Sequence, residues 1–151
     1  MKTLIGISMT LILAGISAGQ DRTHDRDRFA GAWRLVQLEQ PGADGTLRDV
    51  VCTGLFVFTR DGHASVQVMD RDPQTSTTAG PQQYSQGGYE ASWGTYNVDE
   101  GTHTFTFHIE GALVRSLVGK DLPRSYEFSG NRLTVKSTRA NEHWSVTWER
   151  Y

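Results

Sequence analysis

Cysteine is nearly absent from this sequence of 151 residues, in which Cys52 is the only one. No disulfide bond can therefore form within the chain. In an oxidising compartment a single thiol is either buried or reactive. The apolar segment around it, residues 50–56, predicts a buried and inert thiol, with a free reactive thiol or an intermolecular partner as the alternative.

An excess of charge of one sign is also lacking. The chain carries 15 basic and 17 acidic side chains, for a formal net charge of −2 at pH 7. A protein that binds nucleic acid or an anionic membrane normally carries a basic cluster. We therefore expect no nucleic-acid partner, and no membrane partner once the N-terminal segment is cleaved.

Motifs that define common enzyme classes are missing as well. The sequence has no nucleophile elbow, phosphate-binding loop, Cys-x-x-Cys pair or dinucleotide fingerprint. A metal site built on His108 and Glu110 would need a third ligand, for which His63 and His143 are conceivable, but no spacing motif connects these residues. We predict neither a cofactor nor a bound metal.

The N-terminus carries an apolar run over residues 3–13, shorter than the roughly 20 residues that a membrane-spanning helix needs. Lys2 precedes this run, and the small residues Ala14, Ser17, Ala18 and Gly19 follow it. The arrangement predicts a signal peptide over residues 1–19, cleaved after Ala18 or Gly19, and a secreted or periplasmic protein. Residues 20–28 mix acidic and basic side chains and are expected to form a flexible leader.

The clearest pattern in the chain is a predicted β-hairpin over residues 93–110. Apolar and polar side chains alternate on both sides of the segment 99–102. Tyr96 and Val98 share one face of the first run, and Phe105, Phe107 and Ile109 share one face of the second.

Further strands are predicted over residues 29–38, 50–59, 63–69, 124–128, 132–137 and 143–151. In the first of them, alternation places Trp33, Leu35 and Gln37 on one face and puts Leu38 on the other. Residues 70–88 and 111–123 are longer connections. About eight short strands without a long helix predict an all-β fold, a single antiparallel up-and-down β-barrel over residues 29–151. Such a barrel encloses packed side chains or one small ligand.

Four stretches occur in an order and spacing typical of a known family. They are residues 31–36, which read Gly-Ala-Trp-Arg-Leu-Val, residues 54–69, residues 93–110, and the combination of 118–119, 124, 131–135 and 148–150. On these motifs the chain resembles the lipocalin-like domain proteins, small bacterial and fungal barrels related in architecture to lipocalins. It departs from the family pattern at residues 84–89, where Gly87 and Gly88 interrupt a more helical segment.

The resemblance implies a structural role for Trp33. In lipocalins the tryptophan of this motif plugs one end of the barrel, and a late arginine packs across its ring. Arg150 is the best candidate for that arginine and Arg124 is the alternative. The family implies no single reaction.

Two pairs of polar side chains could line a pocket. His108 and Glu110 lie two residues apart on a strand and share a face, as an acid–base pair or as an exposed surface pair. Ser65 and Gln67 share a face in the same way, and they either orient a ligand or face the solvent.

Arg124 shares a face with Tyr126 and Phe128, and it could bind a carboxylate or another anion at the cavity. Its structural role beside Trp33 is the alternative. Aromatic residues clustered in the sequence line the mouth of a pocket or belong to the core: Tyr84, Tyr89, Trp93 and Tyr96.

We therefore expect an exported barrel that binds one small apolar or amphipathic ligand. The candidate ligand-binding residues are Ser65, Gln67, Trp93, Tyr96, His108, Arg124 and Tyr126. The alternative is a small-molecule isomerase, cyclase or lyase in which His108 acts as the base, Glu110 orients it and Arg124 binds an anionic group. A third interpretation is an interaction module that works through residues 70–88.

Overall fold

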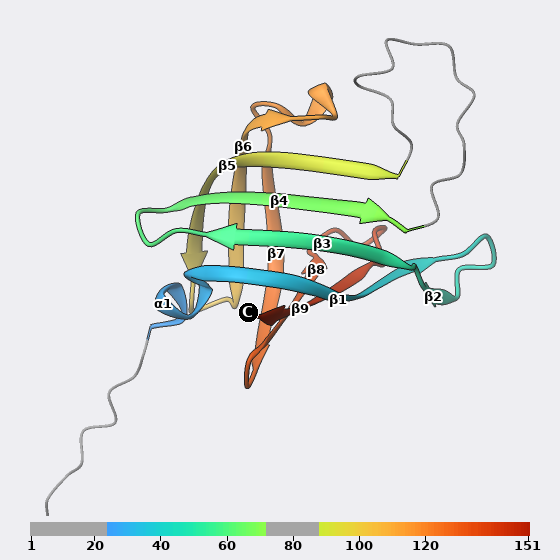
Figure 1. Cartoon of the computed structure of the whole chain (residues 1–151), viewed down its shortest axis with the longest axis horizontal. Coiled ribbons are helices and arrows are strands. Elements are labelled where there is room, and N and C mark those ends of the chain that lie inside the picture. Colours follow the sequence, from blue (N-terminus) through green and yellow to red (C-terminus); the bar gives the residue numbers. More distant parts are fainter. Residues whose placement is uncertain (1–23, 72–87) are drawn as a thin grey trace, which may run out of the picture.

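The computed structural model describes residues 24–71 and 88–151, which form a closed β-barrel (Figure 1). The predicted signal peptide and most of the connection over residues 70–88 lie outside the described residues. The elements are α1 (Asp25–Phe29), β1 (Gly31–Pro41), β2 (Leu47–Asp49), β3 (Cys52–Phe58), β4 (His63–Asp70), β5 (Tyr89–Asp99), β6 (Thr104–Ala112), the 3₁₀ turn η2 (Arg115–Leu117), β7 (Asp121–Ser129), β8 (Arg132–Ser137) and β9 (Ser145–Arg150).

From β3 to β9 each strand pairs with the next in antiparallel orientation, β1 pairs with β3, and the pairing of β1 with β9 closes the sheet. The predicted all-β, up-and-down barrel of eight strands is confirmed. The short β2 is an additional strand that pairs with β1 outside the closed ring. It lies at the end of the barrel opposite α1 (Figure 1).

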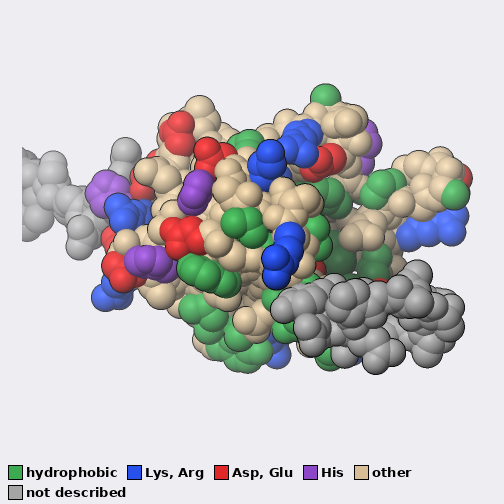
Figure 2. Space-filling view, turned by 90° about the horizontal axis from the view of Figure 1, so that it is seen from above, with side chains coloured by type: hydrophobic (Ala, Val, Ile, Leu, Met, Phe, Trp, Pro, Cys, Tyr) green, Lys and Arg blue, Asp and Glu red, His purple; other side chains and the backbone are tan. Residues whose placement is uncertain are grey.

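The outer faces of the strands carry polar side chains together with exposed hydrophobic ones such as Met69 and Trp93. On the side that Figure 2 shows, acidic, basic and hydrophobic groups are interspersed rather than gathered by kind. In the described parts of the chain, no helix has the length and apolar character needed to cross a membrane.

A short turn with defined hydrogen bonds joins β5 to β6. In the predicted central hairpin, the Asp99 side chain accepts hydrogen bonds from the backbone N–H groups of Gly101 (3.0 Å) and Thr102 (3.3 Å). This is the local bonding that makes aspartate common in turns. The hairpin over β5 and β6 is confirmed, with Tyr96 paired to Phe107 and Val98 paired to Phe105.

A β-bulge in β1 changes which side chains face the barrel interior. Leu35 pairs with Trp148, and Gln37 pairs with Thr147, so Val36 is an extra residue without a partner. Leu38 consequently turns inward and is 7% exposed, while the Gln37 side chain bonds to Asp49 on the outer surface. The prediction that Gln37 shares the face of Trp33, with Leu38 on the opposite face, is therefore wrong.

Aromatic rings fill the end of the barrel that α1 covers. Phe29, which is fully buried, lies at the centre of this plug. Its ring centroid is 4.9–6.0 Å from the centroids of five other aromatic rings: Phe58, Tyr96, Phe105, Tyr126 and Phe128. Edge-on contacts at these distances are favourable arrangements for aromatic pairs.

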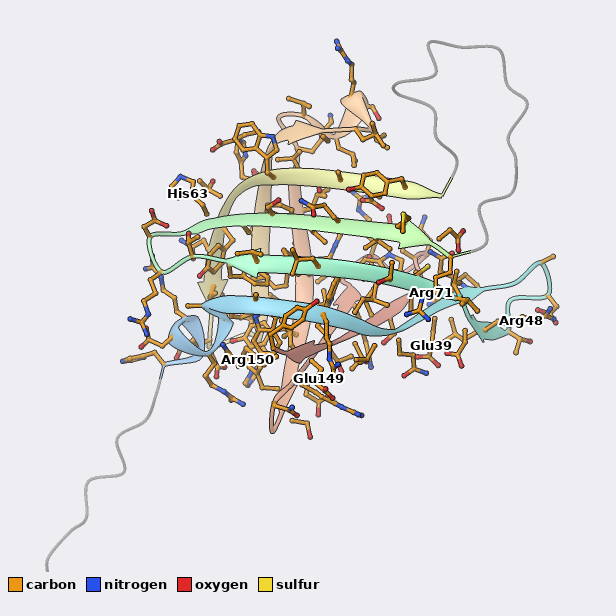
Figure 3. All side chains as sticks on the ribbon, in the orientation of Figure 1. Glu39, Arg48, His63, Arg71, Glu149 and Arg150 are labelled. Carbon is orange, nitrogen blue, oxygen red and sulfur yellow. The ribbon has the colours of Figure 1, made fainter. Side chains whose placement is uncertain are left out.

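Trp33 and Arg150 complete the plug in the way that the family resemblance implies. The Arg150 guanidinium carbon lies 4.3 Å from the centre of the Trp33 ring, and the guanidinium donates hydrogen bonds to the carbonyls of Arg28 and Ala30. Arg150 lies beside α1 (Figure 3). Gly31 is required at this point because its φ is +137° and a Cβ atom there would lie 2.5 Å from Arg150 Nη1.

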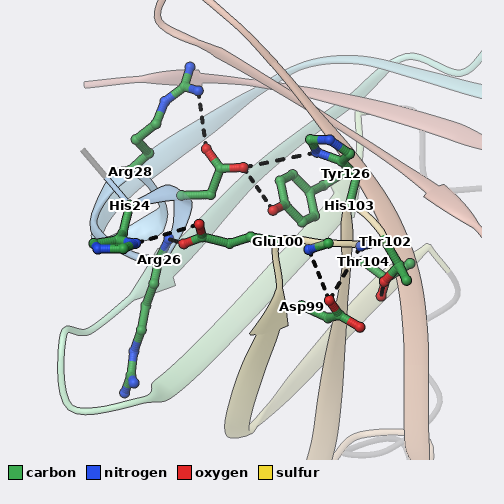
Figure 4. Close-up of polar contacts among 11 residues, drawn as sticks. His24, Arg26, Arg28, Asp99, Glu100, Thr102, His103, Thr104 and Tyr126 are labelled. Atoms are coloured by element: carbon green, nitrogen blue, oxygen red, sulfur yellow. Dashed lines mark hydrogen bonds and ion pairs between the residues drawn. The ribbon is translucent and has the colours of Figure 1, made fainter. Parts of the chain in front are cut away.

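Residues 25–28, which we predicted to belong to a flexible leader, form most of helix α1 instead. Two contacts explain the difference. Phe29 anchors the helix in the barrel, and the Asp25 carboxylate accepts a hydrogen bond from the Tyr126 hydroxyl at 2.9 Å (Figure 4). Asp25 also pairs with Arg28 at 3.2 Å.

Candidate functional site

The end of the barrel opposite α1 is hollow. A cavity of about 260 Å³ lies inside it, and the exposed residues Gln40 and Glu90 mark its mouth. Of its sixteen lining residues twelve are apolar: Leu35, Leu38, Phe56, Val66, Val68, Phe105, Phe107, Leu122, Val135, Trp144, Val146 and Trp148.

The cavity results from the size of the inward side chains along the barrel. At the closed end these positions are aromatic, as in Phe58 and Tyr126. Toward the open end the same faces carry smaller groups, such as Val66 and Val68 on β4 and Val146 on β9. Branched aliphatic side chains reach less far toward the barrel axis than aromatic rings do, so the interior there is unfilled.

Arg124 is the half-buried cation of this cavity. Its guanidinium carbon lies 5.0 Å from the centre of the Trp144 ring, and Nη1 donates a hydrogen bond to the carbonyl of Pro123 at 3.0 Å. Burial lowers the pKa of Arg124, and the negative charges of Glu142 and Glu90 oppose that effect in part. Within residues 24–71 and 88–151, no carboxylate forms an ion pair with it.

A hydrogen-bonded network holds the Trp144 ring against Arg124. The Trp144 indole N–H donates to Glu142 at 3.4 Å. The same carboxylate accepts hydrogen bonds from the Ser137 hydroxyl (2.7 Å) and from Arg139 (2.8 Å). These bonds hold the pKa of Glu142 below its ordinary value, so the carboxylate stays charged at neutral pH.

Ser92 is a second polar group on the cavity wall. The residue is 5% exposed and lines the cavity. A hydroxyl on an otherwise apolar wall can orient a ligand.

The structure brings one of the predicted ligand-binding residues to the cavity, namely Arg124. Tyr96 and Tyr126 also point inward, but they belong to the aromatic plug. The Tyr96 hydroxyl donates to the carbonyl of Thr59 at 2.9 Å, and the Tyr126 hydroxyl donates to Asp25. Burial raises the pKa of both phenols, with the Asp25 charge adding to the effect at Tyr126.

The other predicted site residues lie on the outer face of the barrel. In β6 the core side chains are Phe105, Phe107 and Ile109, so His108 and Glu110 point outward. In β4 the cavity is lined by Val66 and Val68. The same alternation therefore turns Ser65 and Gln67 outward, and Trp93, their neighbour on β5, is 54% exposed.

The predicted acid–base arrangement is consequently not formed. The His108 ring bonds to Asp121 on the outer surface, with Nδ1 and Oδ1 2.7 Å apart, and its side chain is 48% exposed. Arg124 lies on the other side of the sheet, in the cavity. The sheet separates the proposed base from the proposed anion-binding group.

No group of three or more His, Cys, Asp or Glu side chains in the described ranges is placed to hold a metal ion. His63 pairs with Asp61 at 3.2 Å at the turn before β4 (Figure 3). Cys52 is half-buried, with Sγ 3.7 Å from an Asp70 carboxylate oxygen. Burial, and secondarily Asp70, raise the pKa of the Cys52 thiol, which favours the less reactive protonated form.

Sequence reasoning missed Gln40, Glu90, Ser92 and Trp144 as cavity residues. Trp144 shares a face with Val146 and Trp148, and that face is the inner one. Alternation along residues 89–93 places Glu90 and Ser92 on one face of the strand and Trp93 on the other. This pattern is the sequence signal that could have indicated both residues as cavity residues.

A comparison with known protein families agrees with this architecture. A family model described as a lipocalin-like domain matches residues 30–151. No curated protein matches the sequence. Among solved structures, an uncharacterised protein from Bacteroides eggerthii is similar at 12% identity with a TM-score of 0.47, over 82% of this chain and 99% of the other. A redesigned β-barrel is similar at 14% identity with a TM-score of 0.45, over 83% and 94%.

Proposed function

The chain belongs to the lipocalin-like domain family, and on that premise we propose that its barrel binds one small, largely apolar ligand. The cavity of about 260 Å³ opposite α1 is the observation that carries this proposal. It is hollow, it is lined mainly by aliphatic and aromatic side chains, and it reaches the surface at Gln40 and Glu90. These are the features of small-molecule sites in general.

The dimensions favour a compact ligand. Typical pockets for drug-sized molecules measure about 300–1,000 Å³, and this cavity lies just below that range. The aromatic plug closes the far end, so a ligand must enter and leave by the mouth. A ligand that fills the cavity would gain about 25 cal/mol for each Å² of apolar surface that it removes from water.

Displacement of an uncharged fluorophore tests the proposal. N-phenylnaphthylamine should bind to the protein with a rise in its emission and a change in tryptophan fluorescence, because Trp144 and Trp148 line the cavity. Val68→Phe places a ring inside the cavity and should weaken binding at least about tenfold, since a full aromatic ring would occupy the ligand's space. Met69→Phe is the matched control, because Met69 is adjacent on β4 and 47% exposed on the outer face.

The proposal fails if the fluorophore does not bind, or if the two variants bind it equally well. Urea unfolding of both variants verifies that each is folded. Filling a cavity should leave the stability of V68F close to that of the parent protein.

We further propose that the protein is exported, because residues 1–19 have the features of a signal peptide. Expression of the full chain followed by cell fractionation and N-terminal sequencing tests this. The expected product lies outside the cytoplasm and begins at Gly19 or Gln20. An uncleaved chain in the cytoplasmic fraction would contradict export while leaving ligand binding unaffected.

A further inference from the structure

We propose that the ligand is an amphipathic anion, a monocarboxylate whose head group pairs with Arg124 while its apolar body fills the cavity. This inference rests on the proposed function and adds the chemical class of the ligand. It follows from the position of Arg124 in the cavity, from the N–H groups of Arg124 that form no hydrogen bond, and from the contact of its guanidinium with the Trp144 ring.

The Arg124 guanidinium has hydrogen-bond donors to spare. An arginine carries five N–H groups in a planar arrangement, and one of those in Arg124 bonds to the carbonyl of Pro123. Several arginines on the outer surface have carboxylate partners, for example Arg28 with Asp25, Arg34 with Glu149, Arg48 with Asp44, and Arg139 with Glu142. Arg124 has none among the described residues, although it lines an apolar cavity.

An unpaired cation in such a place is unfavourable unless something compensates it. Removing a charge from water costs free energy, and burial already lowers the pKa of Arg124. A carboxylate can accept two parallel hydrogen bonds from a guanidinium, which matches charge and geometry together. A carboxylate ligand would therefore supply the partner that the barrel itself does not.

Trp144 orients the guanidinium for this task. The guanidinium lies over the indole ring, with its carbon 5.0 Å from the ring centre. A cation–π contact of this kind uses none of the guanidinium N–H groups as hydrogen-bond donors to the ring nitrogen or to other acceptors. The bonds from Glu142 to Trp144, Ser137 and Arg139 keep the ring in place, so we assign Glu142 a positioning role.

Glu90 favours a cationic ligand, but less strongly than Arg124 favours an anionic one. It lines the same cavity but is exposed at the mouth, where water screens its charge. Its negative charge favours the charged form of Arg124 without forming an ion pair with it. Glu90→Gln should consequently tighten the binding of an anion and leave a neutral ligand unaffected.

Ligands that share an eight-carbon chain but differ in the charge of the head group distinguish the anionic-ligand inference from the proposal that the cavity binds an apolar ligand. Octanoate, octanol, methyl octanoate and octylamine compete with N-phenylnaphthylamine at neutral pH. Octanoate should bind at least about tenfold more tightly than octanol, as expected for hydrogen bonds to a charged group. Arg124→Gln should remove that difference and leave the affinity for octanol within about twofold of the parent value. Lys136→Gln removes a positive charge from an exposed position on β8 and is the matched control.

Each outcome is decisive. Equal binding of octanoate and octanol, unchanged by R124Q, would overturn the anionic ligand and leave the apolar-ligand proposal standing. Tighter binding of octylamine would overturn it in favour of Glu90. If neither the fluorophore nor any of the four compounds binds, the proposed function fails as well. Should R124Q not fold, the comparison of octanoate with methyl octanoate on the parent protein decides the question.

Discussion

Replacing Phe29 by alanine should destabilise the barrel strongly, because this one side chain joins α1 to the closed end. Phe29 is fully buried and contacts five other aromatic rings. A helix of five residues has little stability of its own. Without the phenyl ring, we expect α1 to detach and the Asp25–Tyr126 hydrogen bond to be lost.

Buried phenylalanine-to-alanine substitutions cost about 3–5 kcal/mol of unfolding free energy, and the full burial of Phe29 places it in that range. The total free energy of unfolding of a single domain is only about 5–15 kcal/mol. With an m-value of about 2 kcal/mol/M in urea, the unfolding midpoint should fall by about 2 M.

Urea unfolding followed by tryptophan fluorescence measures the effect, with Phe29→Leu as the matched control. Leucine retains most of the buried volume but not the ring contacts, so F29L should cost about 1–2 kcal/mol. A loss of less than about 2 kcal/mol in F29A, below the range for a buried phenylalanine, would refute the reasoning, because it would mean that the plug is not organised around this ring.

Three further substitutions test other contacts. Arg150→Lys should lower the unfolding free energy in urea by about 1–2 kcal/mol, because lysine keeps the charge but loses the planar stacking on the buried indole. Tyr126→Phe should cost about 1–3 kcal/mol in thermal unfolding, since it removes the hydrogen bond to the Asp25 carboxylate; an unchanged melting temperature would contradict this. Bonds from neighbouring arginines, Arg34 foremost, hold the pKa of Glu149 below its ordinary value of 4.5. Its stabilising contribution is therefore present above that pH and is lost as the pH falls through the lowered pKa, and Glu149→Gln should make stability less dependent on pH in this acid range.

Local patterns in the sequence were sufficient for the fold class. Alternation over residues 93–110 predicts both strands of the central hairpin, and Asp99 and Gly101 predict its turn, because these preferences act between near neighbours. The family resemblance also implied the packing of Arg150 on Trp33, which the structure contains.

Which face of each strand points into the barrel depends on contacts between residues that are far apart in the sequence. Alternation divides a strand into two faces, but only closure of β1 against β9 determines which face is inside. The bulge leaves Val36 without a partner on β9, and it reverses the predicted orientation of Leu38. The sequence likewise left open whether His108 faces a pocket or the solvent, because alternation alone does not show that Phe107 faces the core.

The sequence by itself therefore determined a barrel of short strands, since side-chain alternation and turn preferences are local properties, and the family resemblance implied the tryptophan plug. The tertiary structure alone decided that one end is filled and the other hollow. That outcome depends on how far side chains from eight different strands reach toward a common axis. The same assembly placed Arg124 on Trp144 inside the cavity, 20 residues away along the chain, where no local pattern could indicate its surroundings.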